Sequence, residues 1–498
     1  DPYLGSRRVM QQDPGAAITV TDSRYGLVEK IHTPLAHDTL LSYTNGMADT
    51  LTAAGGCTRS MGYTPENRLR SVADFDGGLT AIEYSPEGRI TAVTNPAGKV
   101  WRIRRDEWGG VTNAVTPGGR AFALDRDAAG EVSRLADPAG AAWQFAYDRF
   151  GNATQWIDPA GFTNRVSYDT NGLNPISVTD ARGRTTLLDF DDNRRLTVVT
   201  HPDGSSRRRL FDCCAETASV DESGRTNYVY RDALLAVTQM VDRVGTRYSF
   251  RYDSLRNLIS AQDAMGCTNR FNYDGDGRLV AVTNGRGRGF GIDRNADGRP
   301  TVFWLRPMTP FSFEYDAAGN VRTMQPPDLG TERFFYNVMG ELYWRVNGRN
   351  QNAFHSYDDD RHRTATTYDS GSFAAWQYDT RGLITNMTDR SGTTRFDWDA
   401  RHQLSRVTYL YGRQASFSHD IVGLISAVQY PDVFVVSYQR HSGNRVTNML
   451  CGSFSASFKL DAVGRVVEEM YANGAIVRYG RDAEGRLTNL STDVGPFN

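Results

Sequence analysis

Residues 293–298 carry oxygen-bearing side chains in the order that a calcium-binding loop uses. They read Asp-Arg-Asn-Ala-Asp-Gly, which matches the first half of such a loop. A complete loop places a glutamate at its twelfth position, which is Trp304 here, and the sequence predicts no flanking helices. These departures favour an ordinary turn over a metal site.

Residues typical of catalysis are present, but their spacing does not suit a reaction. The eight histidines show no His-Glu-x-x-His spacing, and His355 and His362 lie seven residues apart. Residues 452–456 lack the last glycine of a nucleophile elbow, and residues 285–291 fail the glycine spacing of a phosphate-binding loop. Aspartate recurs at nearly every turn, so no acid–base pair of carboxylates stands out. We expect no enzyme activity, no cofactor and no metal.

The five cysteines say little about disulfide bonding. Cys57, Cys267 and Cys451 are isolated, whereas Cys213 and Cys214 occupy the two middle positions of a turn in which alanine replaces the usual glycine. We expect two free thiols in this turn. Adjacency also permits a vicinal disulfide, which is the alternative.

The aspartates belong to a turn pattern that repeats along the chain. Residues 148–151 and 158–161 each begin with Asp and end with Gly. An aspartate in the first position can accept a hydrogen bond from the backbone two residues on, and glycine tolerates the left-handed backbone. Pro159 presets the second position of its turn. Two turns and two intervening stretches give a period of 21 residues.

This period recurs about twenty times and ends at the turn of residues 482–485. The register slips by one residue near Phe190 and Phe211 and then recovers. A fixed period of this length predicts a repeat array, which we count as one architecture. The structural turn residues of the clearest copies are Tyr147, Asp148, Gly151, Asp158, Pro159, Gly161, Tyr168, Asp169, Gly172, Tyr273, Asp274, Gly277, Tyr315, Asp316, Gly319, Tyr378, Asp379 and Gly382.

Each repeat is predicted to be a β-hairpin. Apolar residues stand two and five positions after the glycine that closes the first of the two turns in a repeat, as Leu279 and Val282 do after Gly277. A spacing of three breaks strand alternation, so we expect a bulge just after the turn that brings both side chains to one face. About 23 hairpins at 4.8 Å per strand give about 220 Å of sheet, and so long a twisted sheet coils or closes. We expect a hollow, mostly antiparallel spiral with consecutive hairpins adjacent.

Composition and charge exclude several classes of protein. The 498 residues include 56 basic and 58 acidic residues, which gives no electrostatic case for nucleic acid or an anionic membrane as partner. No apolar run is long enough to span a membrane. The mean hydropathy of −0.50 and 48 glycines suit a sheet wetted on at least one face. The sequence begins at Asp1 without a signal-peptide pattern.

Written out, the repeat reads Y-D-x-x-G-R-L-x-x-V-T-D-P-x-G, with near-consensus copies at residues 273–279 and 158–161. This pattern resembles the YD-repeat, or Rhs-repeat, family over about residues 63–490. The resemblance implies an all-β sheet that spirals into a hollow shell or cocoon, as in bacterial Rhs toxins, insecticidal toxin complexes and teneurins. It implies a secreted or surface-displayed protein that encloses a C-terminal toxin or serves adhesion. The core and self-cleavage motif that usually follow the repeats in the toxins are absent from this sequence.

We expect degenerate repeats or a cap at residues 1–62 and a continuous YD-repeat shell segment at residues 63–498. The leading hypothesis is a structural shell segment whose partners are an enclosed toxin or effector, or further repeats of the same protein. A second is a surface adhesin that binds a glycan or a protein through exposed aromatics, although recurrent tyrosines more often serve cross-strand packing. A third is a propeller glycosidase, which a period of 21 without 42-residue alternation disfavours.

Overall fold

The structure is a computed structural model that describes residues 7–11, 17–23, 25–33, 35, 37–242, 245, 247–306, 310–431, 434–441, 443–482 and 486–493. The turn predicted at residues 482–485 lies partly outside these ranges. Within them the chain is strand and turn, and the only helical segment is a short 3-10 helix at Leu410–Gly412. None of the helical structure described has the length and apolar character needed to cross a bilayer. The predicted all-β class is confirmed.

The chain divides into two compact units, each built from two stretches that are far apart in sequence. Unit 1 comprises Asp1–Arg120 and Tyr248–Ala375, and unit 2 comprises Ala121–Arg247 and Trp376–Asn498. Two of the boundaries fall within strands, β24 and β36, whose bounds are given below with unit 1.

The strands of unit 1 are short and similar in length. Its first stretch contains β1 (Arg7–Gln11), β2 (Ala17–Asp22), β3 (Val28–His32), β4 (Asp38–Thr44), β5 (Met47–Thr52), β6 (Thr58–Tyr63), β7 (Leu69–Ala73), β8 (Leu79–Tyr84), β9 (Ile90–Thr94), β10 (Val100–Arg105) and β11 (Val111–Val115). Its second stretch contains β24 (Arg247–Tyr252), β25 (Leu258–Gln262), β26 (Thr268–Tyr273), β27 (Leu279–Thr283), β28 (Gly289–Arg294), β29 (Pro300–Arg306), β30 (Phe311–Tyr315), β31 (Val321–Gln325), β32 (Glu332–Tyr336), β33 (Leu342–Val346), β34 (Asn352–Tyr357), β35 (Arg363–Tyr368) and β36 (Phe373–Tyr378).

Unit 2 has the same construction. Its first stretch contains β12 (Ala121–Arg126), β13 (Val132–Ala136), β14 (Ala142–Tyr147), β15 (Ala153–Ile157), β16 (Thr163–Tyr168), β17 (Pro175–Thr179), β18 (Thr185–Phe190), β19 (Leu196–Thr200), β20 (Ser206–Phe211), β21 (Glu216–Val220), β22 (Thr226–Arg231) and β23 (Val237–Val241). Its second stretch contains β37 (Ile384–Asp389), β38 (Gly392–Trp398), β39 (Leu404–Thr408), β40 (Gln414–His419), β41 (Ile425–Gln429), β42 (Val435–Arg440), β43 (Val446–Cys451), β44 (Phe454–Leu460), β45 (Val466–Tyr471), β46 (Ile476–Arg481) and β47 (Leu487–Asp493).

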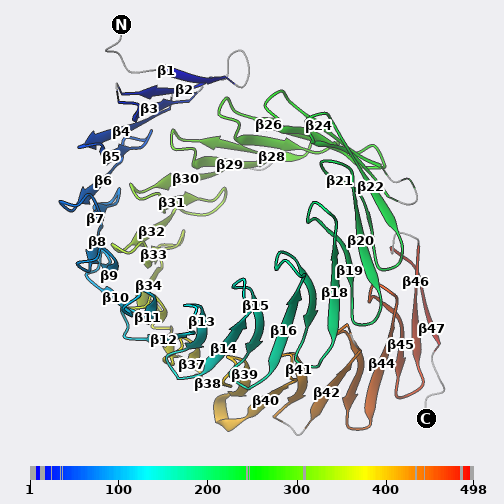
Figure 1. Cartoon of the computed structure of the whole chain (residues 1–498). Coiled ribbons are helices and arrows are strands. Elements are labelled where there is room, and N and C mark those ends of the chain that lie inside the picture. The colour runs from blue at the N-terminus through cyan, green and yellow to red at the C-terminus, as the bar shows by residue number, and fades with distance from the viewer. Residues whose placement is uncertain are drawn as a thin grey trace. The chain divides into compact units, whose positions relative to one another are not determined.

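Consecutive hairpins are adjacent and antiparallel in every stretch (Figure 1). Strands β6, β7, β8 and β9, for example, pair in chain order, with no break after a fourth strand. A propeller would separate its strands into blades of four. The predicted arrangement of adjacent hairpins is therefore confirmed, and the continuous pairing counts against the propeller hypothesis.

A bulge follows the first turn of the hairpins, as predicted. In the β26–β27 hairpin, Tyr273 pairs with Leu279 and Phe271 pairs with Val282, and the register shifts by one residue between these pairs. The extra residue, Val280, restores the alternation, so Leu279 and Val282 reach the same face as the tyrosine. The β8–β9, β12–β13 and β40–β41 hairpins show the same shift.

The sheet has a thin interior. No large side chain among the described residues is fully buried, and the buried apolar residues are small. They are Ala92, Ala136, Ala218, Val346, Val407, Ala415 and Val428. Hydrogen bonds and ion pairs at the turns and between neighbouring hairpins must therefore provide much of the stabilisation that a hydrophobic core provides in a globular protein.

Two turns of unusual length explain the register slip seen in the sequence. The ordinary first turn separates its paired residues by six positions, as from Tyr273 to Leu279. Tyr168 instead pairs with Pro175, one residue later, whereas Phe211 pairs with Glu216, one residue earlier. One turn adds a residue and the other removes it, so the repeat returns to its original spacing.

Replacing Gly277 with valine is expected to lower the free energy of unfolding by about 1 to 3 kcal/mol. Gly277 has a φ of +75°, and an added Cβ would meet only Asn257, at 3.8 Å. The cost therefore comes from the backbone, because a β-branched residue resists positive φ. Gly277→Asn is the control, since Asn67 and Asn444 hold the same turn position at +63°. Equal urea midpoints for the two variants would contradict the expectation.

Candidate functional site

The predicted turn residues lie at the ends of the hairpins. The five tyrosines Tyr147, Tyr168, Tyr273, Tyr315 and Tyr378 end β14, β16, β26, β30 and β36. The turns that follow these tyrosines are opened by Asp148, Asp169, Asp274, Asp316 and Asp379. Asp158 opens the next turn after that of Asp148. The closing glycines have positive φ: Gly151 (+81°), Gly161 (+84°), Gly172 (+67°), Gly277 (+75°), Gly319 (+97°) and Gly382 (+89°). Pro159 is the second residue of the turn that Asp158 opens.

The turn aspartate acts through its side chain as well as its backbone. Oδ1 of Asp148 accepts hydrogen bonds from the backbone N–H groups of Phe150 (2.8 Å) and Asn152 (3.0 Å). Burial raises the pKa of Asp148, but these backbone bonds and the Asn152 side chain outweigh it, so the pKa lies below its usual value. The carboxylate therefore acts as a structural acceptor that holds the turn.

The tyrosine before each turn ties its hairpin to the preceding one. The hydroxyl of Tyr273 donates to the carbonyl of Leu258 at 3.0 Å, and Tyr147 donates to Val132 in the same way at 2.9 Å. Leu258 directly precedes the bulge of its hairpin, where the ladder of backbone bonds is interrupted. Arg294 donates to the equivalent carbonyl of Leu279 at 3.0 Å. In these hairpins the position holds a long side chain with a donor at its tip, a role that the sequence pattern did not reveal.

Tyr273→Phe is expected to lower the free energy of unfolding by about 1 kcal/mol, because it leaves the Leu258 carbonyl without its donor. Tyr230→Phe is the matched control. Tyr230 is 51% exposed, and its hydroxyl has no hydrogen-bond partner in the part of the chain that the structure describes. Urea denaturation of both variants tests the prediction, which fails if the two changes cost the same.

In unit 1, turns from the two stretches bind each other. Three aspartates, each the third residue of its turn, accept a hydrogen bond from the N–H of the third residue of a turn about 242 residues earlier. We call these contacts the unit 1 seam. They are Leu35 N–H to Asp276 Oδ1 (3.2 Å), Gly55 N–H to Asp297 Oδ1 (2.7 Å) and Gly118 N–H to Asp360 Oδ1 (2.9 Å).

Side chains reinforce two of the seam contacts. Asp360 also accepts from the Thr116 hydroxyl (3.0 Å) and pairs with Arg120 (3.0 Å), and the side chains of Asp360 and Arg120 are only 6% and 14% exposed. Asp276 contacts the His37 ring at 3.0 Å. Burial raises the pKa of Asp276, but the hydrogen bonds it accepts outweigh burial, so its pKa lies below the usual value.

Unit 2 joins its two stretches mainly by ion pairs. His402 Nε2 lies 2.7 Å from an oxygen of Asp137, and Arg401 Nε lies 2.7 Å from an oxygen of Asp158. The His402 ring also packs edge-on against Trp143. Arg182 pairs with Asp420 in the same manner. Asp158, which was predicted as a turn residue, thus also joins stretches that are distant in the chain. Asp137 and Asp420, which open equivalent turns, do the same.

A polar cavity of about 370 Å³ lies between turns of the two stretches of unit 2. His201, Asp203, Glu222 and His441 are among the side chains that line it. The hydroxyl of Ser205 donates to Asp203 at 2.6 Å, and His201 contacts Glu222 at 3.3 Å. Among the lining residues no hydroxyl or thiol is paired with a histidine, which is the pair that serine and cysteine hydrolases use.

The calcium-like segment is divided between a strand and a turn. Asp293 lies in β28 and pairs with Val302, while Asn295 opens the turn that follows. Asp297 is bound to Gly55 in the unit 1 seam. The Asp297 carboxylate is therefore already engaged by the backbone of another turn.

The other catalytic candidates also lie in hairpins. His355 contacts the Thr366 hydroxyl at 2.9 Å, and burial, with help from nearby arginines, lowers its pKa. His362 lies beside Arg120 at the unit 1 seam. Residues 285–291 form a turn and the start of β28, and residues 452–456 form a turn and the start of β44. The structure does not combine these residues into one site.

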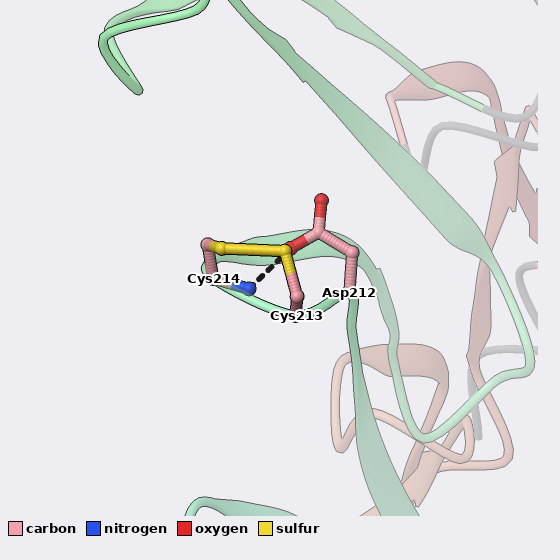
Figure 2. A group of neighbouring side chains, drawn as sticks. All are labelled: Asp212, Cys213 and Cys214. Atoms are coloured by element: carbon pink, nitrogen blue, oxygen red, sulfur yellow. Dashed lines mark hydrogen bonds between the residues drawn. A yellow bond between two sulfur atoms is a disulfide. The ribbon is translucent and has the colours of Figure 1, made fainter.

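Cys213 and Cys214 are joined by a disulfide, which corrects the expectation of two free thiols. Figure 2 shows the bonded sulfurs at the tip of the β20–β21 turn, beside Asp212. The shortened turn brings the two side chains together, and Asp212 Oδ1 holds it by accepting from the N–H groups of Cys214 and Ala215, both at 2.8 Å. Cys57, Cys267 and Cys451 are free.

Two family models match the chain. One, described as Teneurin YD-shell, matches residues 333–498. The other, described as RHS Repeat, matches residues 84–121, 126–163 and 168–206. The chain is a YD-repeat protein. The resemblance drawn from the turn pattern is thus confirmed, whereas no curated protein sequence matches the chain.

Solved structures share the fold of this YD-repeat protein. The Photorhabdus luminescens Tc holotoxin pore has a TM-score of 0.50 and 10% identity over 98% of this chain. TcdB2–TccC3 has a TM-score of 0.50 and 13% identity over 99%, and the same complex without its hypervariable C-terminal region has 0.50 and 11% over 95%. The YD-repeat protein spans about a third of the length of these chains, at 34%, 31% and 34% respectively. At this identity the likeness shows a common β-shell fold.

Proposed function

We propose that this chain is a non-catalytic segment of a β-shell that encloses a toxin or effector polypeptide. The observation that carries the proposal is the joining of distant turns within each unit. A wall that retains a polypeptide must join strands that are neighbours in space but distant in the chain. Asp360 and His402 do so in unit 1 and unit 2, with buried or partly buried partners.

Two further observations support the proposal. The repeated polar residues serve turns and seams, as Asp148 does in its turn and Asp360 does at the unit 1 seam. The Cys213–Cys214 disulfide is typical of an oxidising compartment, which suits a secreted or surface-displayed protein. The partners that we propose for this chain are an enclosed polypeptide or further repeats of the same protein.

The test is protease protection in the complete gene product that carries this chain. A cleavage site for a specific protease is inserted at one position at a time in the remaining sequence, and cleavage is followed before and after mild denaturation. We expect at least one segment that resists cleavage until the repeats unfold. If every inserted site is cut as fast as in a free peptide, the chain does not enclose a polypeptide.

A surface adhesin is the second candidate, and exposed aromatic residues favour it. Phe335, Trp344 and Phe354 stack across three strands, with ring centroids 4.1 and 6.0 Å apart, and Phe354 is 45% exposed. Such rings can stack on sugars. Binding to a glycan array that Phe354→Ala abolishes would favour adhesion, whereas absence of binding would leave the stack with a packing role.

A further inference from the structure

The β20–β21 turn departs from the repeat in three ways at once. It is one residue shorter than an ordinary first turn, alanine replaces its closing glycine, and its two middle residues are bonded cysteines. An ordinary turn is closed by an N–H to C=O bond from its fourth residue to its first, as from Gly277 to Asp274. Here the Asp212 carboxylate and the disulfide take the place of that bond.

The turn has supports that do not depend on the disulfide. Asp212 accepts from two backbone N–H groups, and its own N–H donates to the Ala215 carbonyl at 3.1 Å. Arg195, from the neighbouring turn, donates to the Asp212 carbonyl at 2.8 Å and lies over the Phe211 ring. None of these contacts uses a sulfur atom, so none of them requires the sulfur–sulfur bond.

Asp212, Cys213 and Cys214 are all exposed, and each can offer one ligand atom within 4.8 Å of the others. Both hydrogen bonds to Asp212 use Oδ1, which leaves Oδ2 available. Two thiolates select soft ions, and the carboxylate can supply a third donor. In the disulfide the sulfurs cannot act as thiolate ligands.

We propose that Cys213 and Cys214 form a redox-gated binding site for soft, thiophilic metal or metalloid ions. The site is closed in the disulfide and opens on reduction. A phosphine reductant breaks the sulfur–sulfur bond, takes the oxygen of one water molecule to become a phosphine oxide, and leaves two thiols. An organoarsenic(III) oxide then forms two arsenic–sulfur bonds, and its oxygen leaves as water with both thiol protons.

The probe is phenylarsine oxide, applied to the full chain before reduction and again after reduction and removal of the phosphine. Under denaturing conditions the untreated protein should show three titratable thiols out of five cysteines, and the reduced protein should show all five. By mass spectrometry of the folded protein, only the reduced form should gain one tightly held phenylarsenic group. Cys213→Ser and Cys214→Ser should each weaken binding by on the order of 100-fold, because chelation is lost.

Cys267→Ser is the matched control, since Cys267 is an exposed but isolated cysteine in another turn, and it should bind as the wild type does. Circular dichroism should show that the reduced protein keeps its β-structure. Equal binding by the oxidised protein, undiminished binding by Cys214→Ser, or loss of the β-structure on reduction would each overturn the proposal.

Discussion

Asp360→Ala is expected to lower the free energy of unfolding by about 3 kcal/mol, the largest effect of any single change considered for unit 1. The substitution removes three hydrogen-bond or ion-pair contacts and leaves the mostly buried Arg120 without its closest carboxylate. Arg120 keeps a longer contact of 3.5 Å with Asp358, so the loss lies at the lower end for a broken buried ion pair.

Asp359→Ala is the matched control. Asp359 is the neighbouring residue and pairs with Lys99 at 2.9 Å, again between the two stretches of unit 1. Both side chains are nearly half exposed, so this pair should contribute less than about 1 kcal/mol. Urea denaturation of the two variants compares a buried and an exposed contact at the same turn. Similar decreases in the free energy of unfolding for both variants would mean that the seam contacts of Asp360 stabilise unit 1 no more than an exposed ion pair does.

Acidification from about pH 4 to pH 2 is expected to lower the free energy of unfolding progressively, because many turn carboxylates are stabilised in their charged form. Asp221 is the clearest case. Burial raises the pKa of Asp221, but hydrogen bonds from Arg225 and Ser223 outweigh burial and lower the pKa to about 2. Asp180, Asp379 and Asp461 have pKa values lowered in the same way.

The sign follows from proton binding. Asp221 has a folded pKa below its ordinary value of 3.8, so the unfolded chain binds more protons in this window. The stabilisation is complete above the unfolded pKa and is lost as the pH falls through the folded pKa. Urea midpoints measured between pH 5 and pH 2 test this, with Asp221→Asn expected to show a shallower fall. A midpoint that is flat or rises on acidification would contradict the prediction.

The hairpins and their bulges could be predicted because they depend on local chemistry. The bulge at Val280 follows from the spacing of Leu279 and Val282, and both residues lie in one short segment. The disulfide of Cys213 and Cys214 was only the alternative to two free thiols, because adjacency in sequence does not decide between a bonded and a free pair. The register slip near Phe211 was the available signal.

The seams could not be predicted from the repeat alone. Gly118 and Asp360 are 242 residues apart, which is about eleven and a half repeats. The half repeat arises because Gly118 lies in the second turn of its repeat and Asp360 lies in the first turn of its own. That offset depends on how far the sheet curves, which no local pattern encodes. One signal was present: Asp276, Asp297 and Asp360 share the third position of their turns, where the ordinary turn needs no acid.

The unit 1 seam is the feature on which the proposed wall depends, and hydrogen–deuterium exchange at the Gly118 amide tests it most directly. This N–H donates to Asp360, whereas the N–H of Ala97 in a neighbouring turn donates to Asn95 of its own turn. In the wild type both amides should exchange slowly. In Asp360→Ala the Gly118 amide should exchange faster while the Ala97 amide is unchanged, and Asp359→Ala should affect neither. A Gly118 amide that is unprotected in the wild type, or equally protected in Asp360→Ala, would contradict the seam.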